Sequence, residues 1–210
     1  IERCKARLKR PIDVLLLHNP SSGALVKTAT RELLGTLLKE GVVRSWGASV
    51  GNAEVGKVAI EQGAQVVQVA YNVFHPQDLA PLVAIAKEKQ VGLLVRSVLC
   101  HGLLCGQWPT TKNFPSGDHR RERWTTDELK KRISQLTAVR PSVTGAITSL
   151  RALALRYALS EEAVSSVVIG PKNTLQLDQL VREAGQEPPY LPPEAKTALE
   201  RRLANVGIKP

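Results

Sequence analysis

The chain has little of what marks several classes of protein. It contains three cysteines, Cys4, Cys100 and Cys105, and no CxxC pair. An odd and scattered set of cysteines predicts neither a disulfide framework nor a zinc site, so we expect no metal and a cytoplasmic protein. No apolar run reaches the ~20 residues that cross a bilayer. The charged opening, IERCKARLKR, does not resemble a signal peptide.

Several nucleotide-binding and catalytic motifs are also missing. No GxGxxG follows an expected strand, and neither HExxH nor GxxxxGK(S/T) occurs. The sequence therefore gives no support for a Rossmann-type dinucleotide site.

The charge is strongly unbalanced, whereas aromatic residues are scarce. The formal net charge is +10, and aromatic residues make up 4% of the chain. Excess lysine and arginine predicts an anionic partner, which leaves nucleic acid, a membrane surface or a phosphorylated small molecule. The basic residues are scattered, with one denser patch at residues 119–132, and few aromatics are present to stack on bases. We therefore expect a phosphate-bearing small molecule rather than nucleic acid or a membrane.

Short apolar segments alternate with amphipathic ones. Strands are expected at residues 12–18, 42–49, 66–71, 91–97 and 164–169, and helices at 28–40, 52–62, 79–90, 126–136, 149–159, 175–184 and 194–205. Apolar strands that alternate with helices are typical of an α/β fold with a parallel sheet. Five βα units cannot close an eight-stranded barrel. The chain is therefore expected to be either an open doubly wound sheet or the C-terminal part of a barrel, in a single domain over residues 1–210.

The stretch Ile12–Pro20, IDVLLLHNP, predicts a strand buried on both faces. Its first polar side chain at the C-terminal end is His18. Ligands bind at this end of the strands in parallel α/β folds, so His18 is a candidate catalytic residue. A structural histidine bonded to a neighbouring carbonyl explains the same pattern equally well.

A second candidate site follows the last expected strand. Gly170 and Pro171-Lys172-Asn173 precede a helix, which combines backbone N–H groups, a helix N-terminus and a cation. These features favour phosphate binding, although an ordinary turn with a surface lysine has the same sequence. Residues 98–124 predict a long loop, either functional or mobile. Gly102 and Gly106 within it allow a pyrophosphate to approach the backbone, or serve only flexibility.

Taken in order, five segments resemble the C-terminal two-thirds of the aldo-keto reductases. They are IDVLLLHNP, GVVRSWGAS, VVQVAYN, GLLCG and VVIGPKN, and FPSGDHR at residues 114–120 is similar to a bacterial-type branch. The resemblance implies a (β/α)8 TIM barrel, present here as a partial barrel of about five βα units, strands 4–8, plus a C-terminal helix. It also implies NAD(P)H bound at the C-terminal rim.

The resemblance assigns roles residue by residue. His18 matches the histidine that orients and polarises the substrate carbonyl. The implied cofactor contacts are Ser49 and Gln68 at the nicotinamide carboxamide, Arg96 at the nicotinamide ring, Ser97, Leu99, Gly102 and Leu103 at the pyrophosphate, Lys172 and Asn173 near the adenosine 2′-phosphate, and Gln176 and Gln179 at the adenine. Gly170, in the turn before Lys172, is a further candidate for cofactor binding. The pair Lys172 and Asn173 favours NADPH over NADH. Arg96, Val50 and Leu180 depart from the tyrosine and two asparagines that are usual in the family.

The implied activity is reduction of aldehydes or ketones to alcohols with NAD(P)H, on a small-molecule carbonyl substrate. The family's catalytic tyrosine, lysine and aspartate come from strands that would precede Ile1. We therefore expect the 210-residue chain alone to be inactive. The alternative is a cofactor-binding, catalytically weak interaction or regulatory protein, as the family's potassium-channel β subunits partly are. Nucleic-acid binding is a third, which would require affinity that falls steeply with salt.

The two outer strands of such a partial barrel would be open edges. Residues 12–17 and 167–169 are expected there, and unpaired edges favour self-association.

Overall fold

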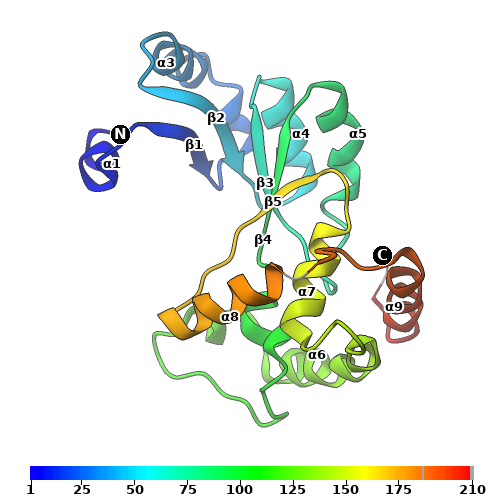
Figure 1. The fold of residues 1–210 in the computed structure, drawn as a ribbon. Coiled ribbons are helices and arrows are strands. Elements are labelled where there is room, and N and C mark those ends of the chain that lie inside the picture. The colour runs from blue at the N-terminus through cyan, green and yellow to red at the C-terminus, as the bar shows by residue number, and fades with distance from the viewer. Residues whose placement is uncertain (186, 209–210) are drawn as a thin grey trace. The chain divides into compact units, whose positions relative to one another are not determined.

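The computed structural model describes residues 1–185 and 187–208, which form two compact units (Figure 1). The sheet unit comprises Ile1–Ala70, Asp78–Arg96 and Ala163–Ser166. The helical unit comprises Tyr71–Gln77, Ser97–Glu162 and the chain from Val167 onward. Within the described residues, none of the helices combines the length and the hydrophobicity of a bilayer span.

Five strands form one sheet in the order β1-β2-β3-β4-β5. Their bounds are β1 Ile12–His18, β2 Val43–Ser49, β3 Val66–Ala70, β4 Gly92–Arg96 and β5 Val164–Val167. The pairs β1–β2, β2–β3 and β3–β4 are all parallel. The parallel α/β sheet expected from the apolar segments is confirmed.

The helices alternate with the strands along the chain. Those of the sheet unit are α1 Glu2–Leu8, α2 Ser22–Leu25, α3 Thr28–Lys39, α4 Ala53–Glu61 and α5 Ala80–Glu88. Those of the helical unit are α6 Thr126–Val139, α7 Leu150–Leu159, α8 Thr174–Ala184 and α9 Pro193–Asn205, with short 3₁₀ helices η1 Cys100–Cys105, η2 His119–Glu122 and η3 Arg140–Ser142.

Side-chain caps fix where several helices begin. Asn52 Oδ1 accepts from the Val55 N–H at 3.0 Å at the start of α4. Ser149 Oγ accepts from the Ala152 N–H at 3.0 Å at the start of α7. Such caps satisfy N–H groups that have no partner inside the helix. The short segment after Pro20 forms α2 for the same reason, because Ser21 caps it.

The first strand differs from its predicted environment. β1 is the outermost strand of the sheet. Leu15, Leu16 and Leu17 are half-buried, and Val14 is 40% exposed. Burial on both faces was therefore the wrong expectation, because a strand needs neighbours on both sides and helices on both faces to be fully covered. The expectation that β1 and β5 are edge strands of the sheet is confirmed.

Close packing between strands explains a glycine in β2. A Cβ atom on Gly47 would lie 2.0 Å from the carbonyl oxygen of Val66, its partner in β3. The interior of the sheet unit includes Trp46, Val67 and Leu93, all buried. A side chain at residue 47 would therefore push β3 away from β2.

The helical unit has its own core around α7. Leu153, Leu155 and Tyr157 of this helix are almost fully buried, and the Tyr157 ring stacks on Tyr71 with centroids 5.4 Å apart. Burial raises the pKa of both tyrosines, so both remain neutral phenols. The α7 helix therefore provides a rigid wall for the segments that surround it.

Candidate functional site

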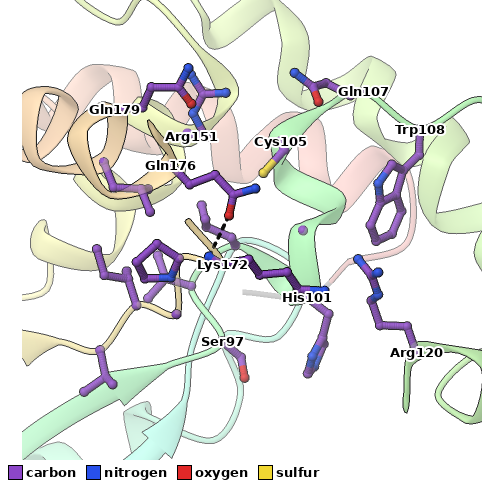
Figure 2. A pocket seen from close by; sticks show the side chains of 18 of the residues that line it. Ser97, His101, Cys105, Gln107, Trp108, Arg120, Arg151, Lys172, Gln176 and Gln179 are labelled. Atoms are coloured by element: carbon purple, nitrogen blue, oxygen red, sulfur yellow. Dashed lines mark hydrogen bonds between the residues drawn. The ribbon is translucent and has the colours of Figure 1, made fainter. Parts of the chain in front are cut away.

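A pocket of about 420 Å³ lies within the helical unit (Figure 2). Its lining comes from the segment after β4, from η2, from α7 and from the segment that leads into α8. The lining residues are Ser97, Val98, Leu99, His101, Gly102, Cys105, Gln107, Trp108, His119, Arg120, Arg151, Val168, Ile169, Gly170, Pro171, Lys172, Gln176, Gln179 and Leu180. Loops at strand ends and one helix N-terminus thus meet at a single cavity.

The segment after β4 has an unusual backbone. Ser97, Cys100 and His101 have φ of 58°, 46° and 56°, and Gly102 has φ of 98°. L residues adopt this left-handed region only at an energetic cost, and such residues concentrate at functional sites. The carbonyl of Ser97 accepts hydrogen bonds from the Cys100 N–H at 2.7 Å and from Asn72 Nδ2 at 3.0 Å. These bonds hold the strained turn in place beside the pocket.

The N-terminus of α8 forms another part of the lining. Asn173 caps the helix by accepting from the Gln176 N–H at 2.9 Å. Gln176 Oε1 in turn accepts from the Lys172 N–H at 2.8 Å, the bond dashed in Figure 2. The Lys172 N–H is therefore already bonded to a side chain of α8. The Lys172 ammonium group remains available to a ligand.

Three permanently charged side chains line the pocket, namely Arg120, Arg151 and Lys172, and both arginines form ion pairs with carboxylates. Arg120 Nε donates to Asp118 Oδ1 at 2.9 Å, and its Nη2 bonds to Oδ2. Arg151 forms a bidentate ion pair with Glu183. Among residues 1–185 and 187–208, no ion pair joins Lys172 to a carboxylate. Of these three cations, Lys172 is therefore the one whose charge is least neutralised and most able to attract an anion.

Asp118 responds to these neighbours. Hydrogen bonds from Arg120, with a smaller contribution from the charge of Lys172, hold the pKa of Asp118 well below its usual range. The Asp118–Arg120 pair therefore stays ionised at any pH near neutrality.

Aromatic rings form a cluster beside the cations. Trp108, Phe114 and Trp124 contact one another edge to face or at a tilt, with centroids 5.1 to 6.5 Å apart. The Arg120 guanidinium lies over Phe114 at 4.6 Å and over Trp108 at 5.6 Å. Aromatic and cation–π contacts of this kind stabilise a folded loop. The segment 98–124, expected to be a long loop, therefore contains the short helices η1 and η2 and a packed cluster of rings.

Two cysteines belong to this region. Cys105 lines the pocket, whereas Cys100 is buried. Burial raises the pKa of the Cys100 thiol to about 12 and also raises the pKa of Cys105, against the opposing charge of Arg151. Both thiols are therefore protonated near neutral pH. In the part of the chain that the structure describes, no group of three His, Cys, Asp or Glu is arranged to hold a metal.

The sheet unit holds the remaining predicted site residues. Ser49 Oγ donates to Gln68 Oε1 at 2.9 Å, because the two residues are partners across β2 and β3. Arg96 Nη2 donates to the Val50 carbonyl at 2.9 Å. His18 is exposed at the C-terminal end of β1 and is the strand partner of Ser49. These residues therefore gather at the C-terminal ends of β1 to β4.

One motif in this region escaped the sequence analysis. Residues 47–51, GASVG, match the GxSxG pattern of serine hydrolases, beginning inside β2 and ending shortly before α4. A nucleophilic serine in that motif lies on a strained turn and hydrogen-bonds to a base. Ser49 instead lies within β2, without positive φ, and donates to an amide oxygen. The geometry therefore does not support a serine nucleophile.

Most predicted residues of the helical unit reach the pocket. Ser97, Leu99, Gly102, Gly170, Lys172, Gln176 and Gln179 line it. Leu103 is buried in the core and Asn173 caps α8, and neither lines the cavity. Sequence reasoning missed Trp108, Arg120 and Arg151, because only the folding of distant segments brings them to the cavity. The sequence did contain signals for Arg120, which lies in the FPSGDHR segment and in the basic patch at residues 119–132.

Comparison with known sequences identifies the family. The sequence model of the aldo/keto reductase family matches residues 1–187. The chain belongs to the aldo/keto reductase family. A search of curated protein sequences finds no match to this aldo/keto reductase chain.

Solved structures share the fold of this aldo/keto reductase. A glycerol dehydrogenase from Gluconobacter oxydans is 23% identical, with a TM-score of 0.82 over 100% of this chain and 64% of that one. The holo form of an aldo-keto reductase from Bacillus halodurans is 22% identical, with a TM-score of 0.73 over 96% of this chain and 64% of that one. The chain thus spans less than two thirds of these structures and shares the TIM-barrel type of fold with them.

Proposed function

We propose that this chain is the cofactor-binding part of an NAD(P)H-dependent oxidoreductase that reduces aldehydes or ketones to alcohols. The observation that carries the proposal is the pocket of the helical unit. A strained turn after β4, the N-terminus of α8 and the Lys172 ammonium all line it. Each of these features favours a phosphate group, and family membership makes a nicotinamide cofactor the phosphate-bearing molecule of choice.

The residues present fit the phosphate-bearing part of such a cofactor. Lys172 would hold an anionic group by charge, and Ser97 and Gly102 lie on the turn whose backbone would approach it. Trp108 and His101 add aromatic surface to the lining. We expect NADPH to bind more tightly than NADH, because a 2′-phosphate gives Lys172 a dianion to contact.

In the sheet unit, the family resemblance assigns further residues to the nicotinamide and to the substrate. Ser49 and Gln68 form a bonded pair that can exchange hydrogen bonds with a carboxamide, and Arg96 presents a planar group near Val50. When bound, the nicotinamide supplies a hydride. His18, exposed at the end of β1, would donate a hydrogen bond to the substrate carbonyl oxygen. Because the chain contains no match to the family's tyrosine proton donor, we expect it to bind cofactor without reducing 4-nitrobenzaldehyde.

The decisive experiment is a titration of the purified chain with NADPH and NADH, followed by tryptophan fluorescence. Trp108 lines the pocket and Trp124 contacts it, so binding should quench their emission. Lys172→Met should weaken NADPH binding about tenfold, since a charge-assisted contact is worth roughly 1.5 kcal/mol or more. NADH binding should weaken less.

Lys130→Met is the matched control. Lys130 is an exposed lysine of α6 that does not line the pocket, so this variant should bind as the wild type does. Absence of binding by the wild type, or equal weakening by both substitutions, would contradict the proposal. Turnover of 4-nitrobenzaldehyde by the 210-residue chain would contradict the expected inactivity.

A further inference from the structure

The carboxylate that pairs with Arg151 lies behind the pocket rather than in it. Glu183 is 9% exposed and does not line the cavity. Arg151 Nε donates to Glu183 Oε2 at 3.1 Å, and Arg151 Nη2 donates to Oε1 at 2.8 Å. Ser149 Oγ also donates to Oε1, at 2.8 Å. The carboxylate thus accepts three hydrogen bonds, which offset the cost of burying it.

This network connects α7 to α8. Ser149 caps α7, Arg151 lies in the first turn of that helix, and Glu183 belongs to α8. Leu180 and Glu183 are the two buried residues of α8. Gln176 and Gln179 of α8 line the pocket. Glu183 therefore bonds Arg151 to the same helix that forms part of the lining.

Among the described lining residues, those from α7 and α8 include no charged side chain besides Arg151. Cys105 is close enough for its pKa to respond to Arg151, and the lining from α8 consists of Gln176, Gln179 and Leu180. The Arg151–Glu183 ion pair carries no net charge. The unpaired ammonium of Lys172 is then the main source of attraction for an anion.

We propose that Glu183 is a positioning residue that sets the charge selectivity of the pocket. It neutralises Arg151 and fixes its guanidinium, so that the number of phosphate groups accepted is set by Lys172. The inference rests on the proposed function in taking the ligand to be a phosphorylated nucleotide. Removing the charge of Glu183 while keeping its shape should expose Arg151 as a second cation and favour ligands with an additional phosphate.

The test is Glu183→Gln in the full 210-residue chain. The probes are ADP-ribose and 2′-phospho-ADP-ribose, which lack nicotinamide and so report on the pocket alone. Their dissociation constants are measured by tryptophan fluorescence at two salt concentrations. The preference for the 2′-phosphorylated probe should rise roughly three- to tenfold, since one added charge near the pocket acts at intermediate dielectric. The gain should shrink at high salt.

Two further variants separate charge from structure. Glu183→Gln combined with Arg151→Met should lose the gained preference, because the exposed cation is gone. Glu194→Gln removes an exposed carboxylate of α9 and should leave the preference unchanged. Thermal denaturation of each variant accompanies the titrations.

Three outcomes would overturn the inference. They are an unchanged preference in Glu183→Gln, equal weakening of both probes, as a purely structural role predicts, and failure of the wild type to bind either probe. Binding of both probes without binding of NADPH or NADH would contradict the proposed function but leave the role of Glu183 standing.

Discussion

The two units use their polar side chains in different ways. In the sheet unit, Ser49 and Gln68 bond to each other across neighbouring strands, and Arg96 bonds to a backbone carbonyl. In the helical unit, Arg120 and Arg151 line a cavity and are bonded to carboxylates. The bonds of the sheet unit follow from the register of its strands. The bonds of the helical unit hold cations in place around a cavity that a ligand can enter.

The comparison predicts that substitutions in the sheet unit act mainly on stability. Gly47→Ala should have the largest effect, because its Cβ would lie 2.0 Å from the Val66 carbonyl oxygen and neither backbone can move without breaking the strand pairing. We expect a loss of at least about 3 kcal/mol in the free energy of unfolding. Urea denaturation followed by circular dichroism measures it.

Gly35→Ala is the control for this change. Residue 35 lies in α3 with open space around it, so alanine should leave stability unchanged or raise it by up to about 1 kcal/mol. Equal stability of the Gly47→Ala and Gly35→Ala variants would show that the β2–β3 contact is not as close as described.

In the helical unit, Gly106→Ala should have an intermediate effect. Gly106 has φ of 71°, and a Cβ there would lie 2.3 Å from Leu150 Cδ1, the flexible end of a side chain. We expect a loss of about 1 to 2 kcal/mol from backbone strain and repacking, together with weaker NADPH binding, because Cys105 beside it lines the pocket. Thermal denaturation and fluorescence titration check the two parts.

Gly117→Ala isolates the strain. Gly117 has φ of 84° and no atom near its Cβ position. The Gly117→Ala variant should therefore be less stable than the wild type but should bind NADPH equally well. Unchanged binding in Gly106→Ala would show that the turn does not shape the pocket.

A smaller effect is expected at the paired side chains of the sheet. Ser49→Ala leaves the side-chain oxygen Oε1 of Gln68 without its donor in a partly buried position, which costs about 1 kcal/mol. Binding of 2′-phospho-ADP-ribose should be unchanged, because this probe lacks the nicotinamide that we assign to Ser49. Weaker binding of that probe would break the division of tasks between the units.

The reactivity of the three cysteines should differ between the two units in the unmodified chain. At pH 8, iodoacetamide should label exposed Cys4 of the sheet unit first, Cys105 next and buried Cys100 last. The order follows because burial raises the pKa of both inner thiols, that of Cys100 to about 12, so their thiolate fraction is small and rises only as the pH increases. Peptide mass spectrometry gives the order, and rapid labelling of Cys100 would contradict it.

The sequence predicted the regular elements better than the lining of the pocket. The apolar segments gave β1 to β5 to within a few residues, and Asn52 marked the start of α4, because strands and caps depend on local patterns. The half-burial of β1 was missed, because burial depends on which segments become neighbours. The roles of Arg151 and Glu183 were missed for the same reason, since these residues are 32 positions apart and meet only in the folded chain.

The central claim is that the pocket of the helical unit binds a nicotinamide cofactor, and hydrogen–deuterium exchange tests it most directly. Exchange is measured on the 210-residue chain with and without saturating NADPH. We predict that protection increases in residues 97–107 and 168–180, which contribute most of the lining. Saturating NADPH that leaves both segments unprotected, while other segments or none become protected, would contradict the account.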